Sequence, residues 1–143
     1  MKKGFTLVEL LIVMVIVGTL VTVALPKYQR SLERGRALEG IRNVQYVAEY
    51  AAAKHMATGS WPTSDEFSTF KNTDVIKSKF FGAPSFTEST QKVTITRSGS
   101  DWGYSLTATI STDDVLSEIA CANTGTEEIC TELDLTGNLM TRQ

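Results

Sequence analysis

The N-terminal part of the chain contains an apolar segment long enough to cross a membrane. After a leader of four residues, it runs from Phe5 to Leu25 and stops at Pro26. As a helix it would span about 31 Å, close to the roughly 30 Å of a bilayer's hydrocarbon core. Lys2 and Lys3 precede it, which predicts a single span with a cytoplasmic N-terminus. An ordinary cleaved secretory signal fits poorly because no A-x-A site follows the segment.

One carboxylate, Glu9, lies near the start of this apolar segment. An ionised carboxylate inside a membrane span costs on the order of 2.5–3.5 kcal/mol, so something must compensate for it. Two explanations are open from the residues alone. Glu9 is either protonated and neutral, or it pairs with a cation on another chain.

Residues 2–10, KKGFTLVEL, and the exit ALPKY at 24–28 resemble the N-terminus of a type IV prepilin. The resemblance implies that a membrane prepilin peptidase cleaves between Gly4 and Phe5, and that Phe5 is then N-methylated. It implies that Glu9 pairs with the Phe5 amine of a neighbouring subunit, so that Glu9, Phe5 and Thr6 set the subunit register. It further implies that the stretch from Gly18 to Pro26 can unwind during assembly.

The function implied by this resemblance is that of a structural subunit, a major pilin, which polymerises into a type IV pilus. Its partners would be further copies of the chain, the prepilin peptidase, the assembly machinery of the inner membrane and minor pilins. The chain would lie in the inner membrane before assembly and in an extracellular filament afterwards. Such pili support adhesion, twitching motility or DNA uptake. Pseudopilins of type II secretion systems share the motif and are the first alternative; a membrane-anchored enzyme or binding protein is the second, and it leaves Glu9 unexplained.

The rest of the chain predicts an α+β fold, in which a long N-terminal helix packs on an antiparallel sheet of about four strands. We expect five parts: the leader 1–4, the membrane and filament-core helix 5–25, an amphipathic continuation 26–58, a connecting loop 59–91, and a sheet with a disulfide region at 92–143. Alternating polar and apolar residues predict strands at 92–97 and 104–111, with two more at 115–122 and 129–135. This architecture matches the pilin fold.

The continuation helix should present one apolar stripe to that sheet. The stripe is formed by Leu38, Ile41, Val44, Ala48, Ala51, Ala52 and His55. Gly35 and Gly40 lower helix stability there or allow a neighbour to approach closely. Thr63 and Glu66 match a capping box that could open a short helix. The aromatic residues near Pro84 should fix the connecting loop to the core.

Two cysteines, Cys121 and Cys130, predict a structural disulfide in an exported chain. Charges are unevenly spread: eight acidic residues follow Gly99 against Arg142 alone, whereas basic residues outnumber acids between Pro26 and Met56, six to three. These regions could attract each other between stacked subunits, or be solvated faces.

No residue pattern predicts an enzyme. The single histidine, His55, has the position of a packed or surface residue, and no nucleophile with a base is apparent. Asp113, Asp114 and Glu118 could bind calcium, but a solvated turn is the favoured interpretation of these residues. The sequence therefore predicts no catalytic residue, no metal site and no cofactor, and nothing in its charge suggests nucleic acid.

Overall fold

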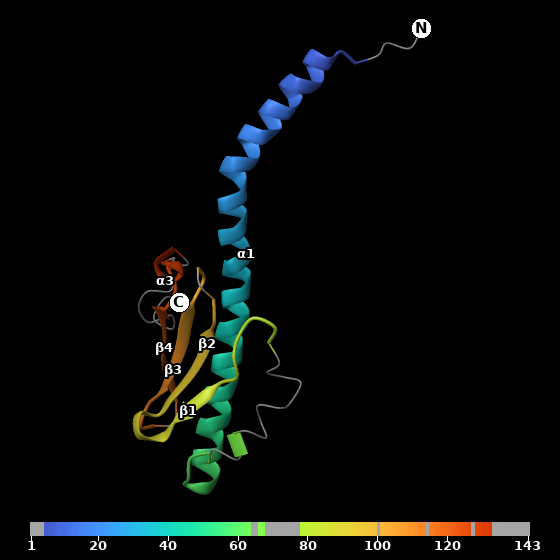
Figure 1. Ribbon diagram of the computed structural model, residues 1–143. Coiled ribbons are helices and arrows are strands. Elements are labelled where there is room, and N and C mark those ends of the chain that lie inside the picture. The colour runs from blue at the N-terminus through green and yellow to red at the C-terminus, as the bar shows by residue number, and fades with distance from the viewer. Residues whose placement is uncertain are drawn as a thin grey trace. The chain divides into compact units, whose positions relative to one another are not determined.

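The computed structural model describes residues 5–63, 66–67, 78–99, 101–113, 115–126 and 128–132. It divides into two compact units, Met1–Arg34 and Gly35–Gln143. Helix α1 (Leu7–Thr58) contributes to both units, and the remaining elements belong to the second (Figure 1).

The described part of the first unit is the beginning of α1. Its large apolar side chains between Phe5 and Leu25 are exposed around the whole circumference of the helix. The helix also includes Pro26, and its assigned span continues on both sides of that residue.

The second unit contains one four-stranded antiparallel sheet in the order β1-β2-β3-β4. Its strands are β1 (Ser85–Thr87), β2 (Lys92–Arg97), β3 (Tyr104–Ile110) and β4 (Leu116–Asn123). β2 and β3 correspond to the strands predicted at 92–97 and 104–111 and form an antiparallel hairpin, with Lys92 opposite Thr109 and Arg97 opposite Tyr104. The α+β prediction of a helix on a sheet of about four strands is confirmed.

The core lies between α1 and one face of the sheet. Side chains alternate strictly along β3, where Tyr104, Leu106, Ala108 and Ile110 are all buried. Val93 and Ile95 of β2 and Ile119 of β4 extend the same layer. This is the inward face expected of strands with a period of two residues.

The helical stripe that covers this layer is partly as predicted. Val44, Ala48, Ala51 and Ala52 are buried, but Leu38 is 57% exposed, so its assignment to the core was wrong. Ala37 and Val47 are buried instead. The true stripe is therefore rotated toward smaller side chains, which lets the helix approach the sheet closely.

Gly40 shows how close that approach is. A Cβ built on Gly40 would lie 2.4 Å from Cζ of Phe81 and 2.7 Å from Cδ1 of Leu106. A Cβ on Gly35 would meet nothing within 4 Å. Of the two explanations for these glycines, close approach of a neighbour holds at Gly40 and does not hold at Gly35.

The region expected to be a loop, 59–91, contains regular structure. It includes the short strand β1 and the 3₁₀ helix η1 (Glu88–Thr90). As predicted, Phe81 and Pro84 are buried, and Phe86 packs against the core.

The capping box at Thr63 is present. The Thr63 N–H donates to Oε2 of Glu66 at 2.9 Å, and the Glu66 N–H donates to the Thr63 hydroxyl at 3.4 Å. Most of the short helix expected after it lies outside the described residues.

The last predicted strand, 129–135, is wrong where the structure describes it. Ile129–Glu132 forms the short helix α3, and residues 133–135 lie outside the described ranges. A disulfide to β4 holds the chain here and restricts its path.

Candidate functional site

Helix α1 begins with a capping box built from Thr6 and Glu9. The Thr6 N–H and the Thr6 hydroxyl both donate to Oε2 of Glu9 at 2.8 Å. The Glu9 N–H donates to the Thr6 hydroxyl at 3.3 Å, and the Leu10 N–H donates to the Thr6 carbonyl at 3.3 Å. Thr6 is therefore the N-cap, and Glu9 occupies the position at which a carboxylate reaches back to it.

This geometry adds an explanation for Glu9 that the sequence analysis did not consider. The carboxylate is hydrogen-bonded within its own chain, next to the helix N-terminus, where the backbone dipole favours negative charge. The T-x-x-E signal at residues 6–9 was present in the sequence and could have revealed it. Part of the expected cost of Glu9 is thus met locally, before any other chain is involved.

The apolar segment itself is exposed in the single chain. Within the described residues, α1 holds a stretch of mean hydropathy 2.7 that is long and apolar enough to cross a membrane, and none of that stretch is buried. Leu7 is 89% exposed and Met14 is 66% exposed. A helix that is apolar on every side belongs in lipid or inside an assembly.

Two threonines in this segment direct their hydroxyl groups to the helix backbone. The Thr19 hydroxyl donates to the Ile16 carbonyl, and the Thr22 hydroxyl donates to the Thr19 carbonyl, both at 2.8 Å. Such bonds satisfy the polar groups but slightly weaken and bend a helix. They lie between Gly18 and Pro26, the stretch expected to unwind.

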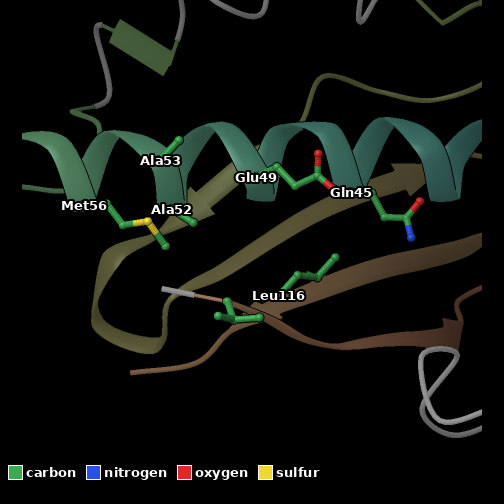
Figure 2. Close-up of a pocket in the computed structure, with 7 residues that line it drawn as sticks. Gln45, Glu49, Ala52, Ala53, Met56 and Leu116 are labelled. Atoms are coloured by element: carbon green, nitrogen blue, oxygen red, sulfur yellow. The ribbon is translucent and has the colours of Figure 1, made fainter. Parts of the chain in front are cut away.

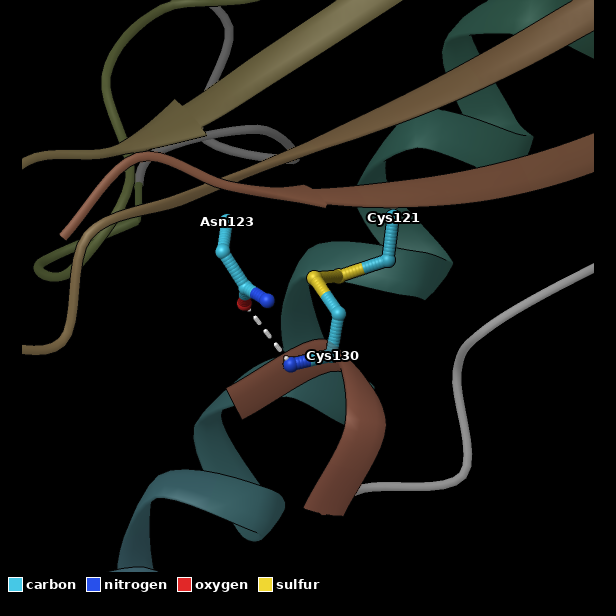
Figure 3. Close-up of a disulfide and its surroundings, with 3 residues drawn as sticks. All are labelled: Cys121, Asn123 and Cys130. Atoms are coloured by element: carbon cyan, nitrogen blue, oxygen red, sulfur yellow. Dashed lines mark hydrogen bonds between the residues drawn. A yellow bond between two sulfur atoms is a disulfide. The ribbon is translucent and has the colours of Figure 1, made fainter. Parts of the chain in front are cut away.

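The predicted disulfide is present between Cys121 of β4 and Cys130 of α3, with a Cα–Cα distance of 5.7 Å (Figure 3). The Cys130 N–H also donates to Oδ1 of Asn123 at 2.9 Å. Ile129 and Cys130 are buried. A covalent bond and a side-chain hydrogen bond therefore hold α3 against the end of β4, and Asn123 is a positioning residue that the sequence analysis missed.

The remaining candidate residues take structural positions. His55 stacks on Trp61, with ring centroids 4.1 Å apart and an interplanar angle of 8°, so it is a packed residue. Among the described residues, no group of three or more His, Cys, Asp or Glu side chains could hold a metal ion. Asp114 of the proposed calcium turn lies outside those residues, as does Gly4 of the proposed cleavage site.

At the C-terminal end of α1, the Glu66 carboxylate accepts a hydrogen bond from the Lys54 ammonium group and is paired with it. This contact, together with the bonds from Thr63, lowers the pKa of Glu66 to about 2. The pair and the capping box fix the start of the connecting loop to α1.

Comparison with known proteins points to the same N-terminal region. Residues 1–25 match the family model described as the prokaryotic N-terminal methylation motif. The chain is 35% identical over 80 residues to a fimbrial protein of Neisseria meningitidis serogroup A, which covers 56% of this chain and 47% of the relative. It is equally similar over 80 residues to the type IV major pilin protein PilE of Neisseria gonorrhoeae, covering 56% and 48%.

A shorter match, 46% identical over 41 residues, is to the type IV major fimbrial protein FimA of Dichelobacter nodosus, covering 29% of this chain and 26% of that protein. The chain spans about half the length of the first of these curated relatives. No solved structure matches the chain significantly.

The chain thus combines an exposed apolar helix, which opens with the methylation motif, with an α+β fold in its second unit. In its N-terminal motif and over about half of its length, the chain is similar to type IV pilins and fimbrial proteins.

Proposed function

We propose that the chain is a structural subunit that polymerises into a type IV pilus and has no enzymatic activity. The observation that carries this proposal is the uncovered apolar helix at Phe5–Leu25. Fully burying one large aliphatic side chain contributes roughly 1.5–3 kcal/mol, so this helix has a strong preference for lipid or for other helices. Lipid surrounds it before assembly, and neighbouring subunits surround it in the filament.

Processing by a prepilin peptidase between Gly4 and Phe5 would prepare the chain for assembly. The match of residues 1–25 to the methylation motif supports both this cleavage and the N-methylation of Phe5. Removing the leader also removes Lys2 and Lys3 and leaves an amine next to Thr6, the N-cap of α1.

Glu9 would then pair with the Phe5 amine of a neighbouring subunit. An ionised carboxylate has about four acceptor sites, and the two donors of Thr6 occupy only part of them. The intersubunit bond can therefore form while the capping box stays intact. In a low-dielectric filament core an unpaired charge is costly, so the pair sets the axial register in which subunits are tolerated.

The stretch from Gly18 to Pro26 would unwind as subunits enter the filament. Pro26 lacks a backbone N–H, and the hydroxyl groups of Thr19 and Thr22 already bond to backbone carbonyls. A Cβ on Gly18 would meet nothing within 4 Å in the single chain, so packing within the chain does not demand a glycine there. Its conformational freedom serves the unwinding instead.

The proposed partners are other copies of the chain, the prepilin peptidase, the inner-membrane assembly machinery and minor pilins. Before assembly the chain would cross the inner membrane once, with its N-terminus in the cytoplasm, and afterwards it would lie in an extracellular pilus that serves adhesion, twitching motility or DNA uptake. The similar relatives are named fimbrial proteins and major pilins, which favours a pilus over a type II secretion pseudopilus.

Electron microscopy and mass spectrometry of material sheared from cells test this function. The expected material is filaments whose subunit begins with methylated Phe5 and contains an intact disulfide. A short periplasmic assembly required for protein export would show a pseudopilin instead.

Cleavage can be tested separately. Gly4→Leu should accumulate uncut precursor, because a side chain there hinders close approach of the protease. Gly35→Leu, a matched glycine substitution away from the cleavage position, should be processed normally. Normal processing of Gly4→Leu would reject the peptidase assignment.

A further inference from the structure

Three cations follow the apolar segment on α1. Lys27, Arg30 and Arg34 are all exposed, and their intervals of three and four residues place them on the same side of the helix. We call these three residues the basic strip. They all belong to the first unit. From residue 10 to residue 32 the sequence contains no Asp or Glu, and the next acid, Glu33, is buried. This end of the apolar segment is therefore bordered by exposed positive charge.

The rest of α1 does not share this uniform charge. Further along the helix, in the second unit, acids and bases alternate at Glu39, Arg42 and Glu49. Glu49 lies beside an apolar groove of about 390 Å³ between α1 and β4, which Leu116 also lines (Figure 2). A helix surface of mixed charge has no net attraction for anions, so an anionic surface should favour the basic strip.

The basic strip begins at the depth of the lipid headgroups when the apolar segment spans a bilayer. The hydrocarbon core would end near Leu25, and the headgroup layer extends about 5–8 Å beyond it. At about 1.5 Å per residue, Lys27 and Arg30 come about 3 and 7.5 Å after Leu25, and Arg34 comes about 13.5 Å after it. Side chains on a helix tilt toward its N-terminus, which here is the direction of the membrane. The long side chain of Arg34 therefore also reaches back toward the headgroups.

An exposed aromatic side chain lies at the same level. Tyr28 is 61% exposed and directly follows Lys27. Tyrosine is enriched at membrane–water interfaces, where its ring meets the apolar region and its hydroxyl group meets the headgroups. Tyr28 and the basic strip lie on different sides of the helix. Lipid headgroups surround a membrane-spanning helix on every side, so they can contact both.

We propose that the basic strip binds the phosphate groups of anionic phospholipids in the non-cytoplasmic leaflet before assembly. This inference rests on the membrane stage of the proposed function and adds a ligand to it. Cleavage after Gly4 would remove Lys2 and Lys3, the side-chain cations at the other end of the span. The basic strip then provides the cationic side chains that flank the span, and it fixes the depth of the processed subunit from the non-cytoplasmic side.

The lipid selectivity of the full-length chain in vesicles tests this binding. Phosphatidylcholine vesicles that contain the chain receive a trace of spin-labelled phosphatidylglycerol or phosphatidylcholine, and electron spin resonance measures the immobilised fraction of each lipid. Lys2→Gln and Lys3→Gln are present in every sample, so that the leader contributes no charged side chain. With the basic strip intact, the chain should prefer phosphatidylglycerol about fivefold or more, because one Lys or Arg near a membrane surface contributes about a factor of five.

Two changes should remove this preference. The strip variant Lys27→Gln/Arg30→Gln/Arg34→Gln should immobilise the two lipids equally. Salt at about 1 M should weaken the preference of the intact strip, because it screens charges at the membrane surface. The matched control variant also loses three exposed cations, but from the second unit, and it should keep the preference: Arg42→Gln/Lys79→Gln/Lys92→Gln.

Three results would overturn the inference: equal immobilisation of both lipids by the intact strip, an unchanged preference in the strip variant, or an equal loss in the control variant. A strip variant that keeps its lipid preference but builds no filaments would assign the basic strip to acidic side chains of a neighbouring copy instead. The proposed function fails separately, if the wild-type chain inserts and selects phosphatidylglycerol but builds no filaments in cells.

Discussion

Replacing Glu9 by glutamine separates the two roles that this carboxylate can have. The glutamine carbonyl can still accept the hydrogen bonds from Thr6, because glutamine also serves in capping boxes. The substitution removes the negative charge and keeps the shape and the cap. Thr6→Val is the matched control, because it removes the hydroxyl of the cap and leaves the charge of Glu9 in place.

The two substitutions are expected to weaken subunit addition by different amounts. Removing one partner of a buried ion pair costs about 3–5 kcal/mol, since the other charge stays buried without compensation. At 1.4 kcal/mol per factor of ten, Glu9→Gln should weaken subunit addition by roughly two to three and a half orders of magnitude. Loss of the N-cap hydroxyl in Thr6→Val costs about 0.5–2 kcal/mol, which is roughly two- to thirtyfold.

The assay is the ratio of sheared filament to total pilin, measured by immunoblot, with membrane fractions to confirm insertion and mass spectrometry to confirm processing. Glu9→Gln should be inserted and processed but should leave almost no filament, and Thr6→Val should still assemble. Abundant filaments from Glu9→Gln would refute the intersubunit pair. Loss of filaments in Thr6→Val together with normal assembly of Glu9→Gln would show that Glu9 acts through the capping box alone.

Three further predictions concern the second unit and can be checked on the detergent-solubilised chain. Gly40→Ala should lower the free energy of unfolding by about 1–2 kcal/mol, since overpacking outweighs the gain in helix propensity, whereas Gly35→Ala should be neutral or stabilising by up to about 1 kcal/mol; denaturant unfolding measures both. Replacing Cys121 and Cys130 together by serine should cost about 2–3 kcal/mol, because the disulfide closes a short loop in the unfolded chain, and an unchanged thermal midpoint would make the bond incidental. The Glu66 carboxylate has a lowered pKa of about 2, so its contribution to the stability of the fold is complete above the ordinary pKa of 4.5. That contribution is lost as the pH falls from 4.5 toward 2. An NMR titration of this carboxyl with a midpoint near 4.5 would contradict its contact with Lys54.

The parts of the fold that follow from local pattern were predictable. The alternation in 92–97 and 104–110 gave the central hairpin, and the long apolar segment gave the start of α1. Strand β1 was not predicted because it has only three residues and lies directly after Pro84, where no alternation can be recognised. Its strand character comes from pairing with β2, which is a tertiary effect.

Two errors have a common physical cause. Leu38 was assigned to the core for its spacing along the helix, but the sheet approaches α1 so closely that small residues, Ala37 and Gly40, occupy the interface. Residues 129–132 were predicted to be part of a strand, but Cys130 must return to Cys121 within a few residues. In both places the local structure is determined by contact with a distant part of the chain. A local sequence pattern does not predict such a contact.

At the candidate site, one short motif supports two different predictions. The residues that resemble a prepilin also include a capping-box sequence, with Thr6 and Glu9 at its ends. The structure contains the reciprocal hydrogen bonds of this capping box. The two functions are compatible, because the cap uses only part of the acceptor capacity of the carboxylate. The helix N-terminus is thus ordered in the single chain, before it meets a neighbour.

A filament reconstruction by electron cryomicroscopy, at a resolution that shows side chains, tests the central claim most directly. The account predicts that the helices of residues 5–25 are packed together inside the filament, with the Phe5 amine of one subunit within hydrogen-bond distance, about 3 Å, of the Glu9 carboxylate of its neighbour. A filament in which Glu9 contacts only Thr6 of its own chain, or in which residues 5–25 lie at the surface, would contradict it.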